Sequence, residues 1–224
     1  MKVKLNRLTF LLKLILAFVV GFLLWKYALL GLDWVAQQFE INSLWIVVLS
    51  RFALLGYLLP FVVWLYFEPQ KVYAFCFGDT KANIKMPFIW YGVKDNVLRV
   101  SIVFSLVCLA LTAVLFYTKH LSLIVLLAGF AFAAVNSILE ELLWRGFILS
   151  RTIQMCGEKL GLILMSLAFG LYHYPLGFSL PICLLFSLGG VYFGGVTVRS
   201  KGLLLGTAMH ISMNLLFVAL EIIF

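Results

Sequence analysis

LSLIVLLAGFAFAAVNSILEELLWRGFILS, residues 121–150, is an apolar stretch long enough to cross a lipid bilayer, yet three ionisable residues stand toward its end. Ionisable side chains within a membrane span are costly and by default mark a functional site. The presence of Glu140, Glu141 and Arg145 in this stretch therefore bears on both the fold and the function of the chain.

The whole chain has the composition of a helical membrane protein. Its 224 residues are 64% hydrophobic and 12% charged, whereas a soluble domain is about 45–50% apolar and about 25% charged. The net charge of +8 does not indicate a nucleic-acid partner, because the basic residues lie between apolar segments, as in cytoplasmic membrane loops. The four cysteines form no CxxC pair, and we expect no cofactor and no metal.

We predict an all-α, polytopic bundle of transmembrane helices in the cell membrane. Seven segments approach the length of about 20 mainly apolar residues that a span needs, and they cover 8–30, 44–67, 97–117, 121–150, 160–175, 180–198 and 202–224. Basic residues precede the first segment and fill alternate loops, so the positive-inside rule predicts a cytoplasmic N-terminus. The aromatic residues of the loop near 68–96 suit the cytoplasmic membrane interface.

Polar residues recur on three of the predicted spans: Glu140, Glu141, Arg145, His173, His210 and Asn214. Glu141 and Arg145 are four residues apart, so they are expected to pair on one helix face. Glu140 is turned by about 100° from Glu141 in an α-helix, which leaves its carboxylate free for chemistry.

The depths of these residues agree. A rise of about 1.5 Å per residue places Glu140, His173, His210 and Asn214 about 12–20 Å from the cytoplasmic ends of their spans. This common layer predicts an active-site cavity that opens to the cytoplasm. Each residue also has a structural explanation, since a buried histidine can link two helices and a Glu–Arg pair can hold them together.

Three motifs give the chain a family resemblance. EELLWR (140–145) fits EExxxR, FGLYH (169–173) fits FxxxH, and HISMN (210–214) fits HxxxN. In this order they resemble the CPBP, or Abi, family, which includes type II CAAX prenyl endopeptidases and bacteriocin-processing and immunity proteins. The resemblance covers about residues 121–219 and implies an intramembrane endopeptidase of glutamate type.

The resemblance also implies a role for each motif residue. Glu140 and His173 would activate a water, His210 and Asn214 would stabilise the oxyanion, and Glu141 and Arg145 would support or orient the site. Residues 121–224 would form the CPBP-type catalytic core, preceded by N-terminal transmembrane helices in residues 1–120. The seven predicted spans are one fewer than the eight of CAAX proteases in this family.

Several functions stay open on the sequence. The substrate would be a membrane-associated peptide or protein, such as a prenylated C-terminus, a bacteriocin precursor, a peptide pheromone or a membrane-protein loop. One alternative is a non-catalytic scaffold, or a bacteriocin-immunity or regulatory protein, that binds a membrane-protein partner. A second alternative is a zinc-dependent membrane protease with His173, His210 and a glutamate as ligands, although HExxH is absent.

Overall fold

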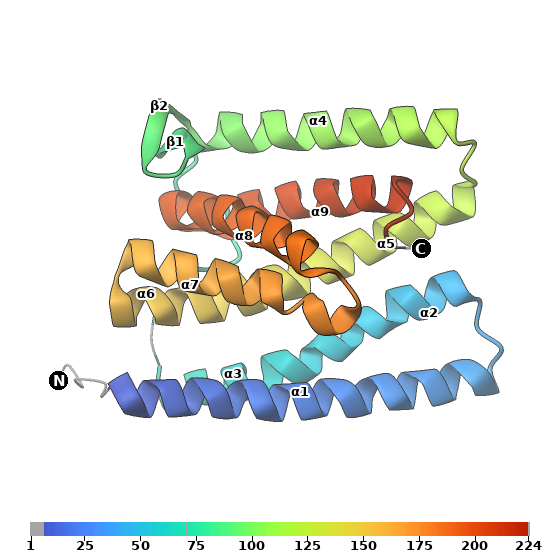
Figure 1. Ribbon diagram of the computed structural model, residues 1–224, viewed down its shortest axis with the longest axis horizontal. Coiled ribbons are helices and arrows are strands. Elements are labelled where there is room, and N and C mark those ends of the chain that lie inside the picture. Colours follow the sequence, from blue (N-terminus) through green and yellow to red (C-terminus); the bar gives the residue numbers. More distant parts are fainter. Residues whose placement is uncertain (1–6, 70, 224) are drawn as a thin grey trace. The chain divides into compact units, whose positions relative to one another are not determined.

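Most of the chain is helical (Figure 1). The computed structural model describes residues 7–69 and 71–223. Its α-helices are α1 (Arg7–Gln38), α2 (Ser43–Ser50), α3 (Leu54–Phe67), α4 (Val97–Thr118), α5 (Leu123–Glu140), α6 (Ser150–Cys156), α7 (Glu158–Leu171), α8 (Leu180–Ser200) and α9 (Leu204–Ala219). Two short 3-10 turns, η1 (Arg51–Ala53) and η3 (Tyr174–Leu176), and a π-helix, η2 (Glu141–Leu149), complete the helical structure. Strands β1 (Asn83–Phe88) and β2 (Tyr91–Asn96) form one antiparallel hairpin.

Five helical segments of the described residues are long and apolar enough to cross a membrane: Leu8–Gln38, Ser43–Phe67, Val97–Thr118, Leu123–Cys156 and Leu180–Ser200. They coincide with five of the seven predicted spans and support an integral membrane protein. The other two predicted spans coincide with α7 and α9, which have 14 and 16 residues. Both are shorter than the about 20 residues that a span needs.

Contacts divide the chain into two compact units, Met1–Gln70 and Lys71–Phe224. In the first unit α1 packs along α3, and the rings of Phe18 and Phe61 lie 5.5 Å apart. All six candidate site residues belong to the second unit. The boundary predicted near residue 120 stays a prediction.

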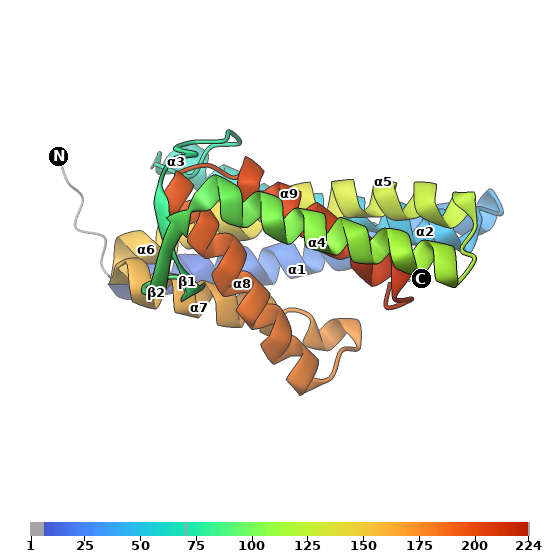
Figure 2. The same cartoon turned by 90° about the horizontal axis from the view of Figure 1, so that it is seen from above.

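Helix α9 is the centre of the second unit. Helices α4, α5 and α8 all pack against it, and α7 packs on α8 (Figures 1 and 2). Gly129 allows α5 to come close to α9, because a Cβ atom at this position would lie 2.8 Å from a methyl group of Val218. The motifs on α5, α7 and α9 thus belong to helices that pack into one bundle.

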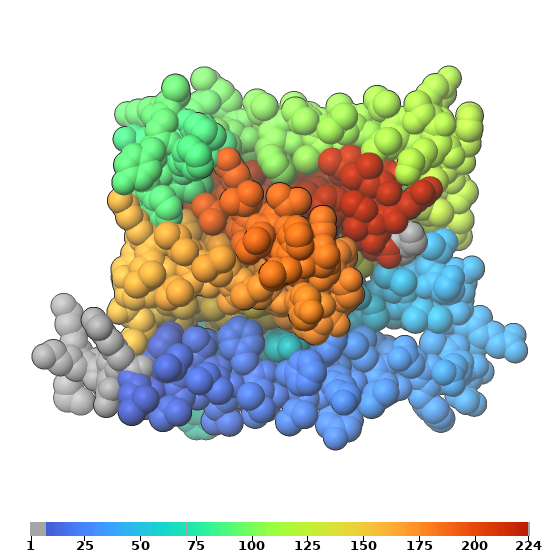
Figure 3. All heavy atoms as spheres, viewed as in Figure 1, coloured from blue at the N-terminus to red at the C-terminus, as the bar shows by residue number. Residues whose placement is uncertain are grey.

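Residues 83–96 of the loop predicted near 68–96 form the β-hairpin that precedes α4. Ile84 and Ile89 are buried in a cluster with apolar side chains of α8 and α9, including Phe193 and Met209. The hairpin is therefore fixed to the bundle, and its atoms (green) adjoin α8 (orange) on the face drawn in Figure 3. Asn96 ends the hairpin and caps α4, since its side chain accepts a hydrogen bond from Leu98 N.

Candidate active site

The first motif lies where α5 changes into a π-helix. Helix α5 ends at Glu140, and the π-helix Glu141–Leu149 continues directly into α6. A π-helix has i→i+5 hydrogen bonds, usually occurs as a single turn, and is frequent at functional sites. The residues after Glu140 consequently advance around the helix axis less than the α-helical spacing predicts. Hydropathy does not distinguish the two geometries, so the sequence did not reveal this change.

Glu141 and Arg145 form the predicted ion pair. Arg145 Nη1 lies 3.0 Å from Glu141 Oε1, and both side chains are completely buried. The same carboxylate oxygen accepts a hydrogen bond from His210 Nδ1 at 2.9 Å. Glu141 is therefore held by one residue of its own π-helix and by one residue of α9.

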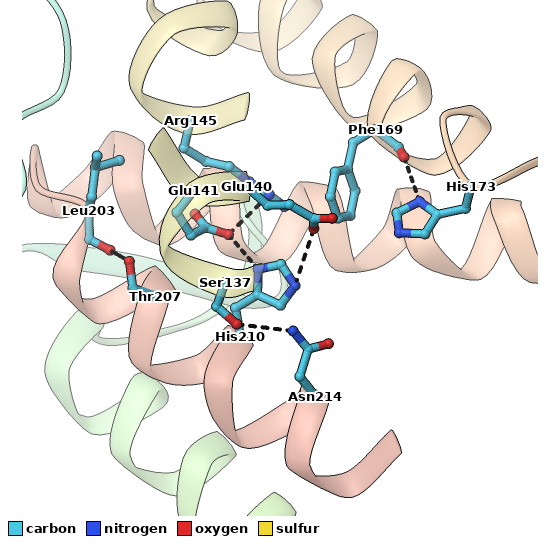
Figure 4. Close-up of polar contacts among 10 residues, drawn as sticks. All are labelled: Ser137, Glu140, Glu141, Arg145, Phe169, His173, Leu203, Thr207, His210 and Asn214. Atoms are coloured by element: carbon cyan, nitrogen blue, oxygen red, sulfur yellow. Dashed lines mark hydrogen bonds and ion pairs between the residues drawn. The ribbon is translucent and has the colours of Figure 1, made fainter. Parts of the chain in front are cut away.

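His210 lies between the two glutamates (Figure 4). Its Nδ1 contacts Glu141, and its Nε2 lies 3.6 Å from Glu140 Oε2. The two carboxylates thus approach one imidazole at unequal distances, and Glu140 makes the longer contact. Oε2 of Glu140 is buried and has no hydrogen-bond partner in the described part of the chain.

Aromatic rings enclose these charges. The guanidinium carbon of Arg145 lies 4.3 Å from the ring centre of Phe169 and 5.4 Å from that of Phe193, distances suited to a cation–π interaction. Phe193 also stacks on His210, with ring centres 5.1 Å apart. Phe169 belongs to the predicted FxxxH motif, but Phe193 was missed. Its only sequence signal is the glycine-rich run GGVYFGG in which it stands.

Asn214 lies one turn beyond His210 on α9 and contacts α5. Its Nδ2 donates a hydrogen bond to the Ser137 hydroxyl at 3.0 Å, and both residues are buried. Ser137 was not predicted as a site residue. Its position four residues before Glu141 places both on one face of a helix, which is the signal that could have found it.

His173 follows α7 and is part of the same aromatic layer. Its Nδ1 lies 2.9 Å from the Phe169 carbonyl oxygen, and its ring stacks on Phe186 with centres 4.2 Å apart. The Phe169 ring contacts both histidines, with its centre 5.0 Å from His173 and 6.2 Å from His210. Figure 4 draws no direct bond between His173 and Glu140 or Glu141.

The zinc alternative lacks a ligand set in residues 7–69 and 71–223. No three histidine, cysteine, aspartate or glutamate side chains there are placed to hold a metal ion. Nδ1 of His173 is hydrogen-bonded to the backbone carbonyl of Phe169. The cavity that opens to the cytoplasm stays a prediction.

The fold and the buried cluster define a polytopic membrane protein with an ionisable site inside its helical bundle. Residues 122–216 match the family model described as Type II CAAX prenyl endopeptidase Rce1-like. This segment is therefore similar to type II CAAX prenyl endopeptidases, which supports the resemblance drawn from the three motifs and indicates a protease. The searches of curated proteins and of solved structures give no match.

Proposed function

We propose that the chain is an intramembrane endopeptidase of glutamate type that hydrolyses a peptide bond of a membrane-associated substrate. The observation that carries the proposal is the different environment of the two adjacent glutamates. Glu141 is bound by Arg145 and His210, whereas the buried Oε2 of Glu140 has no hydrogen-bond partner among the described residues. Glu141 is suited to hold the site together, and Glu140 is suited to accept a proton.

Hydrolysis would begin with Glu140 as the general base. Its carboxylate takes a proton from a water molecule, whose oxygen attacks the carbonyl carbon of the scissile bond. The carbonyl oxygen then becomes negatively charged, the C–N bond breaks, and the leaving nitrogen takes up a proton. The products are a carboxylate and an amine.

His173 is suited to deliver the proton to the leaving nitrogen. The Phe169 carbonyl can only accept a hydrogen bond, so the proton of a neutral His173 is on Nδ1. Its Nε2 is then the nitrogen that can take a proton and pass it on. The carbonyl therefore selects the tautomer, as a backbone acceptor often does for a functional histidine.

Asn214 and His210 are suited to stabilise the oxyanion. The amide nitrogen of Asn214 carries two hydrogens, and only one is directed at Ser137. Nδ1 of His210 donates to Glu141, so Nε2 can donate only when the ring is an imidazolium. In that form the charges of Glu140, Glu141, Arg145 and His210 sum to zero, which lowers the cost of burying them.

With the N-terminus in the cytoplasm, as the basic residues of alternate loops predict, this site would lie toward the cytoplasmic side of the membrane. The family name makes a prenylated C-terminal segment the leading substrate class. A bacteriocin precursor or a peptide pheromone is an alternative substrate that the same catalytic groups could hydrolyse.

A matched pair of glutamine variants tests the proposal. Purified wild type, Glu140→Gln and Glu141→Gln are reconstituted in lipid nanodiscs and incubated with a farnesylated peptide that ends in a CAAX sequence. We expect Glu140→Gln to fold as the wild type does and to release no product. Where the peptide is not cut, peptides from cells with the wild type and with Glu140→Gln are compared, to find the natural substrate.

Two results would contradict the proposal. Wild-type function of Glu140→Gln in cells would favour the scaffold alternative, because a scaffold does not need a base. Loss of activity on exhaustive chelation, with recovery on addition of zinc, would favour the metalloprotease alternative. We expect activity to survive chelation.

A further inference from the structure

A second polar site lies outside the catalytic cluster, between the β-hairpin and the ends of α7 and α8. It is a pocket of about 380 Å³ lined by four cationic side chains and two aromatic rings. These residues are Lys85, Lys94, Lys159, Arg199, Trp90 and Tyr91. We call it the hairpin pocket.

Two of its lysines oppose each other in the hairpin. Lys85 of β1 is the cross-strand partner of Lys94 of β2. Side chains in such a pair have Cβ atoms about 4.5–5.5 Å apart, and like charges there destabilise a sheet. Both side chains are exposed, so an anion can enter between the two ammonium groups and relieve this repulsion.

The protein supplies little negative charge of its own at this place. The carboxylate of Glu158 accepts from Arg199 at 2.9 Å and from Trp90 Nε1 at 3.0 Å. Lys159 reaches the Tyr91 hydroxyl at 3.3 Å, and that group carries no charge. Asp95, next to Lys94 in the strand, pairs with Arg99 and lies on the other face of the hairpin.

The rest of the hairpin has the character of a membrane-surface element. Phe88 and Val93 near its turn expose 66% and 78% of their surface. The Trp90 ring is half-buried at the pocket wall, and Lys159 Nζ lies 5.9 Å from its centre. Aromatic rings concentrate at the headgroup level of a bilayer, where lysine side chains can reach the phosphates.

We propose that the hairpin pocket binds the phosphate group of an anionic phospholipid. A phosphate between Lys85 and Lys94 relieves their repulsion, and Lys159 adds a third donor from α7. Basic pockets between transmembrane helices on the cytoplasmic side bind anionic lipid headgroups in this way. The acyl chains would lie beside Trp90 and Tyr91, the aromatic residues that line the same pocket.

Lipid retention tests this assignment. The full chain is purified in a neutral detergent and incubated with phosphatidylglycerol or phosphatidylcholine of the same acyl chains, and bound lipid is measured by native mass spectrometry. The wild type should retain more phosphatidylglycerol than phosphatidylcholine. The variant Lys85→Gln/Lys94→Gln/Lys159→Gln should weaken retention by about tenfold to a hundredfold.

The matched control removes the same charge from neighbouring segments. Lys71, Lys81 and Lys201 are exposed and lie outside the pocket lining. Lys71→Gln/Lys81→Gln/Lys201→Gln should retain phosphatidylglycerol as the wild type does. Equal loss in both triple variants would overturn the proposal, because retention would then depend on overall charge.

Inorganic phosphate distinguishes a lipid site from a site for free anions. A large molar excess should leave the bound phosphatidylglycerol in place, because the lipid also has its acyl contacts. Displacement by inorganic phosphate would show a site for soluble anions and would overturn the lipid assignment.

A single substitution gives an independent readout. Without lipid, Lys85→Gln should raise Tm by about 1–3 °C, because it removes a like-charge pair. With phosphatidylglycerol added, the wild type should gain more stability than the variant. If Lys85→Gln lowers Tm equally with and without the lipid, the lysine is structural and the proposal fails.

Discussion

At the scale of single residues, the buried ion pair of Glu141 and Arg145 is the contact whose loss should cost the most stability. Removing one partner leaves the other charge buried and uncompensated, which costs about 3–5 kcal/mol. Glu141→Gln and Arg145→Met should therefore each lower the thermal stability strongly, and the double variant should lose less than the sum of the two. Thermal unfolding in detergent measures this. Strictly additive losses would contradict a direct pair.

Asn214 tests the oxyanion role. Loss of one oxyanion donor lowers kcat by about 10²–10³ and should leave KM nearly unchanged, because the contact strengthens only in the transition state. We expect this for Asn214→Ala, and at least as much damage from Asn214→Asp, whose carboxylate repels the developing charge. A raised KM with intact kcat would make Asn214 a substrate-binding residue.

Ser137 should act through Asn214. Its hydroxyl is the hydrogen-bond partner that orients the amide, so Ser137→Ala should lower kcat less than Asn214→Ala does. Ser137→Thr retains a hydroxyl and should recover part of the loss. Steady-state kinetics of the three variants measure this, and equal kcat for Ser137→Ala and the wild type would remove Ser137 from the site.

At the scale of helices, Gly170 sets the contact between α7 and α8. A Cβ atom there would lie 2.7 Å from the backbone nitrogen of Ser187 and would overlap the Cys183 carbonyl. Gly170 also accepts a hydrogen bond from His173 N at 3.1 Å. Gly170→Ala should therefore separate the helices, displace His173, and lower both activity and stability, the latter by about 1–3 kcal/mol.

Gly189 is the control for this substitution. It lies on α8, and the nearest atom to a Cβ there is a ring carbon of Phe193 at 4.0 Å. Gly189→Ala should keep activity and gain slightly in stability, because alanine favours a helix over glycine. Activity assays and thermal unfolding compare the two variants. Equal effects would show that helix propensity, not close packing, decides at Gly170.

How far the sequence predicts these elements depends on the type of signal. Hydropathy located the five long apolar helices, because membrane insertion depends on the same average over about 20 residues. The i, i+4 rule predicted the Glu141–Arg145 pair, because both residues belong to one helix. Neither rule contains the distance between different helices, so the position of His210 between Glu140 and Glu141 and the Ser137–Asn214 bond could not be predicted.

The β-hairpin and the aromatic contacts of Phe193 could not be predicted from the sequence for a related reason. Residues 83–96 contain two lysines and a glycine and lack a strong alternation of apolar residues, so no strand signal stands out. Phe193 is one of 21 phenylalanines in the chain. Only tertiary packing distinguishes it from those that face lipid.

At the scale of the whole molecule, the orientation in the membrane can be tested with a native cysteine. Cys76 is exposed, and Cys108 and Cys183 are buried. The basic residues around Cys76 predict that it faces the cytoplasm. A membrane-impermeant maleimide should therefore label it in inside-out vesicles and not in intact cells.

Two variants complete this labelling experiment. Cys76→Ser should lose most of the label in inside-out vesicles. Phe39→Cys, at an exposed position between the first two predicted spans, should be labelled in intact cells in the background of Cys76→Ser. Labelling of Cys76 in intact cells would reverse the orientation and place the catalytic site at the outer side.

The π-helix also affects how this segment tolerates changes in length. Deleting one residue between Leu142 and Ile148 would let the ordinary α-helical hydrogen bonds re-form. The helix after the deletion would then rotate relative to Glu140 and Glu141, and the buried side chains that follow, such as Leu149, would leave their present contacts. A single-codon deletion here should consequently abolish function even where each residue can be substituted singly, so homologous genes are expected to differ in this segment by replacements and rarely by gaps.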